Sequence, residues 1–401
     1  MSSTRKARPR TMFAADAAAI YDRVTDNRSR HVRLDRLLVE AAAMAPGLLP
    51  SAEDLAAEAQ RPLKDKQGIE TDQALFLSHL FADRERGQHL CHAMLLPLAR
   101  SVELLPRLMK QGSLDLGTVA VSRLGKASVV EMRNSRFLNA LDDSTIAPLE
   151  TAVDLAIMDP ATEIAVLRGG IIQGGKYAGR RIFSAGINLT RLYQGKIPLC
   201  FYFEHLLGYE HKIFRGLARP DATIDDIAGT TREKIWIAAV DGFAIGGGCQ
   251  HLLVMDYVLA ARDAYLTLPA RKEGIIPGAS NLRLARFVGD RLARQAIMYG
   301  RRFDCGSAEG RLICDEVVPS LIGAAFGLTR SHSICSASTS RSTRASRHYV
   351  ILARRSSPTW SDTGMHNSAP CECPPARRSG SHLARRDSRE VNSINIVANN
   401  H

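Results

Sequence analysis

The spacing of apolar residues predicts helices in the first part of the chain. In RLDRLLVEAAAMA (33–45), apolar positions recur three and four residues apart, and Pro46 and Gly47 follow as a stop signal. SAEDLAAEAQ (51–60) opens with a serine and carries acids in its first turn, which is the pattern of a capped helix. We therefore expect an all-helical N-terminal domain over residues 1–115. The same helical periodicity continues over 71–83 and 89–109.

The pattern changes to that of strands near residue 117. VAVSRLGKASVVEM (119–132) predicts a hairpin that turns at Gly125 and Lys126, and a helix is expected over 142–158. Because strands and helices then alternate with short connections, we expect an α/β domain over residues 116–318 with right-handed crossovers. Its other predicted elements are strands at 163–170, 234–242 and 256–263 and two helical pieces within 281–300.

Two glycine-containing loops in this domain suggest chemistry. DGFAIGGGCQ (241–250) reads as the end of a strand, a glycine-rich turn and the start of a helix. Three consecutive glycines let the backbone approach a bound molecule closely, because no Cβ intervenes. RRIFSAGINL (180–189) offers a second loop with an exposed N–H group. Two backbone N–H groups aimed at one oxygen form an oxyanion hole, and loss of one such donor costs about 10²–10³ in rate.

The basic charge of the chain is concentrated near its C-terminal end. The net charge is +12, and residues 319–401 hold eleven Arg, no Lys and four acids. The rest of the chain shows no basic stripe interleaved with aromatic residues, so no nucleic-acid partner is expected. The 319–401 segment also holds sixteen Ser and shows no period. Two interpretations stay open for this atypical segment, a disordered Arg/Ser-rich tail or a shift of reading frame after CDEVVPS.

Other features bear on location and on metals. No stretch approaches the ~18 uninterrupted apolar residues of a membrane span, and the basic start of the chain is not followed by the apolar run of a secretory signal. We therefore expect a cytoplasmic protein with no membrane partner. The eight cysteines are scattered, and we interpret them as reduced thiols. Cys371 and Cys373 lack the spacing of a zinc ligand set, so no metal site is expected.

Four motifs in order along the chain carry a resemblance to a known family: RNSRFLNAL (133–141), FSAGINL (183–189), DGFAIGGGCQ (241–250) and EGIIPG (273–278). They resemble the crotonase (enoyl-CoA hydratase/isomerase) superfamily, whose members stabilise enolates of coenzyme A thioesters. The resemblance implies a crotonase-like ββα spiral core and an acyl-CoA substrate. It also implies an oxyanion hole formed by the N–H groups of Ile187 and Gly247. The residues it places along the substrate and its coenzyme A moiety are Arg136, Phe137, Ala185, Gly186, Asn188, Gly246 and Gly248.

Hydratases of this superfamily use two glutamates to add water, and both positions differ here. Gln250 stands at one of them and Ala270 at the other. Neither side chain can act as a general acid or base, so simple hydration is disfavoured. Glu273 follows three residues after Ala270, and we interpret it as a structural or salt-bridging residue.

A narrower resemblance, over residues 15–318, is to the metal- and cofactor-free dioxygenases of this superfamily. It implies that 3,5-dihydroxyphenylacetyl-CoA and O2 give 3,5-dihydroxyphenylglyoxylate and free coenzyme A, as in the dihydroxyphenylglycine route to glycopeptide antibiotics. This reaction needs an oxyanion hole but no glutamate pair, because the aryl ring and the thioester both delocalise the carbanion. Gln250 is then a catalytic-site residue that orients the substrate. The alternative for Gln250 is a bond to the backbone at the start of its helix.

The chain departs from this dioxygenase branch at two positions. An acid is expected directly after the Asn-Ala pair, where the chain has Leu141. An arginine is expected in the helix before LGY, where the chain has Glu204, His205 and Leu206. His205 is a candidate replacement that contacts the substrate, and the alternative is a residue on the helix surface.

Two other functions stay open beside the dioxygenase. One is an enoyl-CoA hydratase or isomerase, and the other is a catalytically impaired protein that binds coenzyme A. The second possibility comes from residues 319–401, because subunits of this superfamily usually end in helices that pack on the core and complete trimers. A homotrimer or hexamer is expected where the C-terminus permits it.

Overall fold

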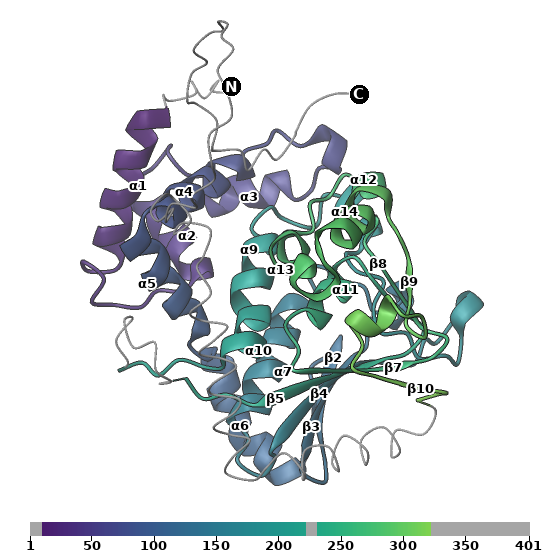
Figure 1. The fold of residues 1–401 in the computed structure, drawn as a ribbon. Coiled ribbons are helices and arrows are strands. Elements are labelled where there is room, and N and C mark those ends of the chain that lie inside the picture. The colour runs from purple at the N-terminus through teal and green to yellow at the C-terminus, as the bar shows by residue number, and fades with distance from the viewer. Residues whose placement is uncertain (1–9, 222–230, 322–401) are drawn as a thin grey trace, which may run out of the picture. The chain divides into compact units, whose positions relative to one another are not determined.

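The computed structural model describes residues 10–221 and 231–321 (Figure 1). All of them belong to the first of the two units into which the chain divides, Met1–Arg354. The Arg/Ser-rich tail predicted at 319–401 lies outside the described residues from position 322 onward. Within the described ranges, no helix has the length and apolar character needed to cross a membrane.

Helices make up the first part of the described chain, as the apolar spacing predicts. The predicted helix at 51–60 is α3, where the Ser51 hydroxyl accepts from the Asp54 N–H at 3.1 Å and the Asp54 carboxylate accepts from the Ser51 N–H at 2.9 Å. This reciprocal cap satisfies two backbone donors that a helix start leaves unpaired. The helices are α1 (Arg10–Val24), α2 (Leu34–Met44), α3 (Ala52–Glu58), α4 (Glu70–Ala82), α5 (Arg84–Leu95) and α6 (Ala99–Gln111), with the short turn η1 (Leu63–Asp65).

One helical segment is interrupted where the sequence periodicity is continuous. The helical pattern over 89–109 is divided between α5 and α6. Leu96 ends α5 with an extended backbone (φ −67°, ψ 143°) because Pro97 follows it, and a residue before proline is driven out of the helical region. The first strand, β1 (Ser113–Asp115), starts just inside the range expected to be helical.

A seven-stranded sheet forms the centre of the remaining chain. The predicted hairpin is confirmed as an antiparallel pair that turns at Gly125, where φ is +57°. From β3 onward the neighbouring strands of this sheet run parallel. The order is β1, β2 (Val119–Leu124), β3 (Ala127–Met132), β4 (Ile164–Gly169), β5 (Ile235–Val240), β7 (Tyr257–Ala261) and β10 (Glu316–Val318).

Helix α7 (Ile146–Met158) is buried along nearly its whole length. It contacts β2 and β3 of the large sheet and also α6 and η4. This position explains why its sequence, IAPLETAVDLAIM, carries few polar residues: a helix that is covered on most sides needs no polar stripe. The predicted helix at 142–158 is therefore confirmed, although it starts later than expected.

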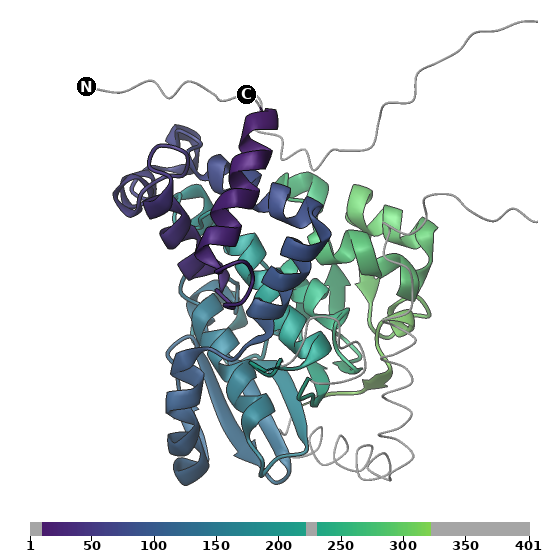
Figure 2. The same ribbon diagram turned by 90° about the vertical axis from the view of Figure 1, so that its left-hand side faces the viewer.

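A second, smaller sheet and a group of short helices complete the fold. The small sheet pairs β6 (Phe243–Ile245) with β8 (Tyr265–Thr267) and β8 with β9 (Phe303–Asp304). In both views α1 to α5 form a group of helices apart from the large sheet (Figures 1 and 2). The short elements are η2 (Ser135–Phe137), η3 (Gly175–Tyr177), α8 (Leu189–Tyr193), α9 (Phe201–His205), η4 (Leu206–Glu210), α10 (His211–Arg215), α11 (Gly247–Leu252), α12 (Ala270–Glu273), α13 (Gly278–Val288), α14 (Asp290–Tyr299) and η5 (Gly310–Leu312).

Candidate active site

The two motifs predicted to form the oxyanion hole lie side by side. The N–H of Ser184 donates to the oxygen of Phe243 at 3.1 Å, and the N–H of Ile245 donates to the oxygen of Ser184 at 3.0 Å. Gly186 follows with φ of +83°. A Cβ on Gly186 would lie 2.5 Å from the oxygen of Ile245 and 3.2 Å from the nitrogen of Gly247. Glycine is therefore required where the two loops meet.

Ile187 and Gly247 each present a backbone N–H beside one cavity. The chain around Ile187 is fixed on both sides, because Leu141 donates to the oxygen of Gly186 at 2.7 Å and accepts from the N–H of Asn188 at 2.8 Å. Gly247 is the first residue of α11, so its N–H has no acceptor within that helix. Neither N–H has an acceptor among the described residues. These two donors can bind an oxyanion together, and their role in catalysis stays a prediction.

The cavity beside these donors is largely apolar and has a volume of about 120 Å³. Its walls come from the loop at 185–189, from α9 and the start of η4, from the glycine turn, and from α12 with the loop that follows it. Four of the residues that line the cavity have polar side chains: Tyr202, His205, Gln250 and Glu273. Most of its apolar lining is Leu141, Ala185, Leu189, Phe201, Leu206, Ile245, Leu268, Ile275 and Ile276.

Both positions at which hydratases carry glutamates belong to the cavity lining. Gln250 is half-buried, and its Oε1 accepts from the N–H of Ser280 on α13 at 3.3 Å, so this bond is to the backbone of another helix and not at the start of its own. Ala270 opens α12, and Glu273 ends it. Glu273 lines the cavity and has no ion-pair partner among the described residues, so a salt-bridging role is wrong, while a structural role stays a prediction.

His205 belongs to a buried hydrogen-bonded network behind the cavity. Its side chain is buried at the end of α9, so the alternative of a helix-surface residue is wrong. The Nε2 atom of His205 lies 2.9 Å from Oε1 of Glu210. The His205 ring also stacks on Tyr209, with ring centroids 5.1 Å apart. The Tyr209 hydroxyl in turn lies 2.8 Å from Nε2 of His251.

The charges in this network follow from burial and from hydrogen bonding. Burial alone would raise the pKa of Glu210, but the hydrogen-bonded His205 and the nearby His251 and Arg283 outweigh it, so this pKa lies below its ordinary value. Burial lowers the pKa of His251 to about 4. At neutral pH the network therefore holds an ionised Glu210 and a neutral His251.

His205, Glu210 and His251 are also the one group, within the described ranges, whose donor atoms lie close enough to hold a metal ion, all within 4.8 Å. Two histidines and a carboxylate are chemically suited to a transition metal. The two Nε2 atoms are already paired inside the network, however, that of His205 with Glu210 and that of His251 with Tyr209, whereas Oε2 of Glu210 and Nδ1 of His251 are buried without a partner among the described residues. We therefore interpret the group as a hydrogen-bonded network.

Of the predicted binding residues, Ala185 and Gly246 line the cavity, whereas Asn188, Gly248 and Arg136 lie around the motifs without lining it. Asn188 is buried and caps α8, with its Oδ1 accepting from the Arg191 N–H at 3.2 Å. Gly248 allows close packing, because a Cβ there would lie 2.7 Å from the Ser184 Cβ. Arg136 is exposed, with its guanidinium 5.4 Å from the centre of the Phe137 ring. Contact of these residues with coenzyme A stays a prediction.

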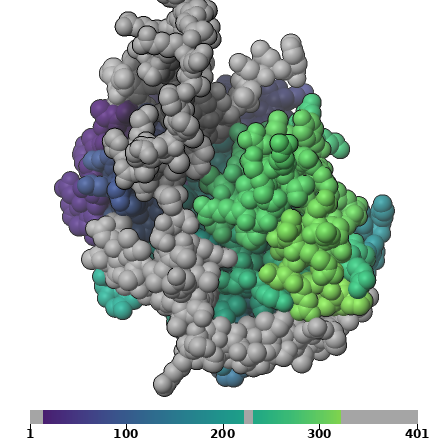
Figure 3. Space-filling view, viewed as in Figure 1, coloured from purple at the N-terminus to yellow at the C-terminus, as the bar shows by residue number. Residues whose placement is uncertain are grey.

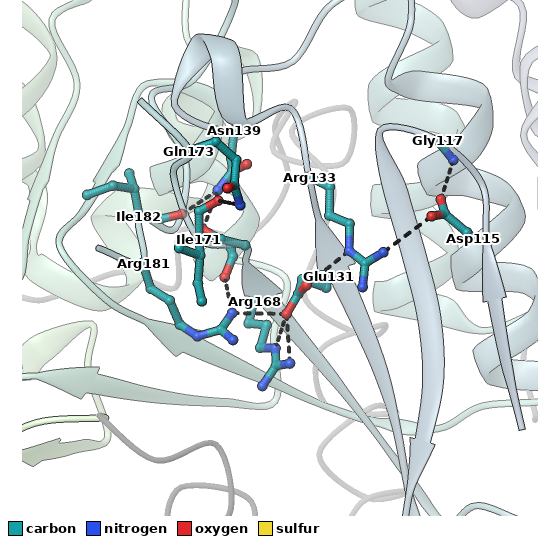
Figure 4. Close-up of polar contacts among 12 residues, drawn as sticks. Asp115, Gly117, Glu131, Arg133, Asn139, Arg168, Ile171, Gln173, Arg181 and Ile182 are labelled. Carbon is teal, nitrogen blue, oxygen red and sulfur yellow. Dashed lines mark hydrogen bonds and ion pairs between the residues drawn. The ribbon is translucent and has the colours of Figure 1, made fainter. Parts of the chain in front are cut away.

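A polar cluster at the ends of β3 and β4 holds the loop that leads into the FSAGINL motif at 183–189 (Figure 4). Glu131 on β3 pairs with Arg168 of β4 at 2.7 Å and with Arg181 at 2.9 Å. Burial would raise the pKa of Glu131, but these arginines lower it overall. The Asn139 amide donates to the oxygen of Ile182 at 2.7 Å. These bonds fix the chain just before the residues that carry the oxyanion hole.

Sequence reasoning missed the pairing of His205 with Glu210. In an α-helix, residues three and four apart share a face, so an acid five residues after a histidine gives no signal. Glu210 nevertheless comes within hydrogen-bonding distance of His205, because Leu206–Glu210 form a π-helical turn with a non-helical Gly208 (φ −82°, ψ −113°). Such wide turns occur frequently at functional sites.

Comparison with known proteins agrees with this geometry. The family model described as enoyl-CoA hydratase/isomerase matches residues 125–330. This chain belongs to that family. A relative named (3,5-dihydroxyphenyl)acetyl-CoA 1,2-dioxygenase, from Amycolatopsis orientalis, is 47% identical over 306 residues, which cover 76% of this chain and 70% of the relative. The superfamily predicted from the four motifs is therefore confirmed, and so is the α/β fold class with helices before the sheets.

More distant relatives are hydratases. The mitochondrial enoyl-CoA hydratase of Pongo abelii is 28% identical over 192 residues, which cover 48% of this chain and 57% of that protein. Among solved structures, an enoyl-CoA hydratase from Thermoplasma volcanium GSS1 matches with a TM-score of 0.47 and 24% identity, covering 60% of this chain and 84% of that one.

Proposed function

We propose that this chain is a dioxygenase that converts (3,5-dihydroxyphenyl)acetyl-CoA and O2 into 3,5-dihydroxyphenylglyoxylate and free coenzyme A. The observation that carries the proposal is a cavity with two free backbone N–H groups, on Ile187 and Gly247, and no glutamate at either hydratase position. The 47% identity to the dioxygenase of Amycolatopsis orientalis supports the same reaction.

The reaction begins with an enolate. Loss of a proton from the α-carbon places negative charge on the thioester oxygen, and the N–H groups of Ile187 and Gly247 stabilise that charge. O2 accepts an electron from the enolate and recombines at the α-carbon to give a peroxide. The peroxide attacks the thioester carbonyl and expels coenzyme A, which leaves a four-membered peroxide ring. The O–O bond of that ring then breaks as the second α-hydrogen leaves as a proton, and the aryl glyoxylate results. The apolar walls of the cavity suit both the aryl ring and O2.

The polar side chains of the cavity are the candidates for binding the ring hydroxyls. Leu141 and Leu206 line the cavity close to where the dioxygenase branch is expected to carry an acid and an arginine. Tyr202, Gln250 and Glu273 line the same cavity and can donate or accept hydrogen bonds. We propose that these three side chains take over recognition of the ring.

Oxygen dependence tests the proposal. The purified full chain is incubated with (3,5-dihydroxyphenyl)acetyl-CoA with and without O2, and free thiol and O2 uptake are followed together. We expect one O2 consumed for each thiol released, and both atoms of ¹⁸O2 in the glyoxylate. Equal thiol release without O2 would identify a thioesterase instead.

The second candidate is an enoyl-CoA isomerase, and a specific observation favours it. Glu273 provides a half-buried carboxylate in the cavity lining, and a single carboxylate can move a proton between two carbons of an acyl chain. Turnover of a 3-enoyl-CoA that is lost in Glu273→Gln would establish this function. Binding of coenzyme A thioesters without any turnover would instead indicate the impaired protein.

Cofactors, assembly and location complete the proposal. We propose that the reaction needs no metal or organic cofactor, since O2 is a co-substrate and coenzyme A is part of the substrate. We also propose a homotrimer or hexamer. Large apolar side chains on α13 and α14 support association, because Leu282 and Tyr299 are each 72% exposed. Figure 3 shows the surface of this part of the chain in green. The cytoplasmic location stays a prediction from the sequence.

A further inference from the structure

His205 stands between the buried network and the cavity. Its ring is buried, yet the residue belongs to the cavity lining. The Cε1 atom of His205 lies 3.8 Å from the position that a Cβ on Gly247 would occupy. The edge of the ring that carries Cε1 therefore faces the glycine that offers one of the two N–H donors.

The two nitrogens of His205 have different surroundings. Nε2 pairs with Oε1 of Glu210 at 2.9 Å. Nδ1 has no hydrogen-bond partner in the part of the chain that the structure describes. Nδ1 is bonded to Cε1, the ring atom that faces Gly247 in the cavity lining. Nδ1 is thus the nitrogen that a bound molecule can reach.

Glu210 fixes which nitrogen of His205 carries the proton. The side chain of Glu210 is 2% exposed, and the pKa of its carboxyl group lies below its ordinary value although burial alone would raise it. An ionised carboxylate only accepts hydrogen bonds, so Nε2 of His205 must be the donor. In this arrangement the ring lone pair lies on Nδ1. A carboxylate that orients a histidine in this way also stabilises the imidazolium formed when the ring takes up a proton.

We propose that His205 is the catalytic base that removes the α-proton of the bound thioester, and that Glu210 is its positioning residue. This inference rests on the proposed function. In the step, the Cα–H bond breaks and the proton moves to Nδ1. The electron pair of that bond moves into the enolate, whose oxygen accepts from the N–H groups of Ile187 and Gly247. His205 becomes an imidazolium paired with Glu210, and no other reactant is consumed.

The remaining cavity-lining side chains are weaker candidates for this base. The Gln250 amide cannot accept a proton at neutral pH and is bonded to the backbone of Ser280. The Tyr202 hydroxyl is a poor base, because burial raises its pKa to about 12 and keeps it protonated. Glu273 is the one competitor with a carboxylate, and it lies on α12 rather than beside the glycine turn.

Exchange of the α-proton in D2O without O2 isolates this step. The full chain is mixed anaerobically with (3,5-dihydroxyphenyl)acetyl-CoA, and deuterium at the α-carbon is measured by mass spectrometry. We expect exchange with the unchanged protein and a loss of about 10²–10⁴-fold in His205→Gln, the range for removal of a general base. Exchange in Glu210→Gln should also fall. The dissociation constant for the thioester should change little in either variant, and free imidazole should restore exchange to His205→Gly.

Several results would overturn the proposal. These are no exchange by the unchanged protein, full exchange in His205→Gln, or loss of exchange in Glu273→Gln but not in His205→Gln. A tightly held stoichiometric metal whose removal abolishes exchange would also overturn it, in favour of a metal centre on His205, Glu210 and His251. Circular dichroism and melting temperature show whether each variant is folded, and Glu210→Gln provides the second test if His205→Gln is not.

The same samples separate this inference from the proposed function. Exchange without O2 uptake in air would leave His205 as a base and refute the dioxygenase. O2 uptake that persists undiminished in His205→Gln would leave the dioxygenase and refute the base.

Discussion

At the scale of single residues, the predicted oxyanion hole depends on Gly186. Its φ of +83° and the 2.5 Å approach of the Ile245 oxygen leave no room for a Cβ. Gly186→Ala should therefore displace the N–H of Ile187 and lower kcat for the thioester by about 10²-fold or more, the effect of losing one donor. Steady-state kinetics with (3,5-dihydroxyphenyl)acetyl-CoA measures this.

Gly174→Ala is the matched control. Gly174 has an extended backbone, with φ −155°, and nothing lies within 4 Å of its missing Cβ. This variant should keep the wild-type kcat. A Gly186→Ala protein as active as the control would show that the N–H of Ile187 isn't a donor in catalysis.

A second residue-scale prediction concerns the carboxyl group of Glu204 on α9. Burial, with added repulsion from Asp35 and Glu150, raises its pKa to about 7. The pKa of Glu204 is higher in the folded state than in the unfolded state. The contribution of its protonated carboxyl group to the stability of the fold is therefore complete below about pH 4.5 and is lost as the pH rises through 7. Glu204→Gln should therefore increase the free energy of unfolding at pH 8 by about 3 kcal/mol.

Urea unfolding at pH 5 and pH 8 measures this difference. The control is Glu103→Gln, which replaces an exposed carboxylate on α6. A gain in Glu204→Gln that is the same at both pH values would contradict the raised pKa.

At the scale of elements, three imidazole rings link α5 to the chain before α2. His31 stacks between His89 and His92, with ring centroids 4.7 Å apart in each case. Burial lowers the pKa of all three, that of His89 to about 4. The unfolded chain takes up these protons near pH 6.5, so the folded state loses stability as the pH falls from about 6.5 toward 4.

His31→Phe tests this coupling. Phenylalanine keeps a ring between the other two and removes one group that titrates. The drop in melting temperature between pH 7 and pH 5 should therefore be smaller than in the unchanged protein. His79→Phe on α4, which replaces a half-buried histidine outside the stack, should retain the full drop. An equal drop in both variants would exclude the stack as the cause.

The elements themselves follow closely from sequence periodicity, whereas the site follows only in part. The helices at 33–45 and 51–60 and the hairpin at 119–132 depend on local spacing and capping, which a sequence displays directly. The motifs around Ile187 and Gly247 were visible for the same reason. The His205–Glu210 pair depends on a π-helical turn, and the cavity position of Glu273 depends on how α12 packs. Neither has a local signal.

At the scale of the whole described molecule, the N-terminal helices support the wall of the cavity. The apolar cluster formed by α1, α2, α4 and α5 also includes Cys200, and Phe203 and Leu207 pack against it. Phe81 of α4 and Phe203 of α9 stack with their ring centroids 6.1 Å apart. The turn that carries His205 is thus held from behind by helices distant in sequence. The helices and the catalytic core should consequently lose structure together.

Lys212 offers a test of whether the N-terminal helices and the large sheet unfold together. Its side chain is fully buried on α10, and Nζ lies 2.7 Å from both Oε1 of Glu150 and Oδ1 of Asp154. Arg33, just before α2, pairs with the same Glu150 oxygen at 2.6 Å, and Ser101 of α6 donates to Asp154 at 2.8 Å. Lys212→Met leaves two buried carboxylates poorly compensated, and we expect a loss of about 3–5 kcal/mol in the free energy of unfolding.

The measurement uses two probes of one urea titration. Fluorescence of Trp236 on β5, in a chain that also carries Trp360→Phe, reports on the large sheet, and far-ultraviolet circular dichroism is dominated by the helices. Because the network ties α2, α6, α7 and α10 together, both transitions should move to lower urea by the same amount and stay superimposed. Lys110→Met, at an exposed position on α6, should leave them in place. Two separated transitions in Lys212→Met would mean that the helices and the sheet unfold independently. The N-terminal helices would then support His205 through local packing alone.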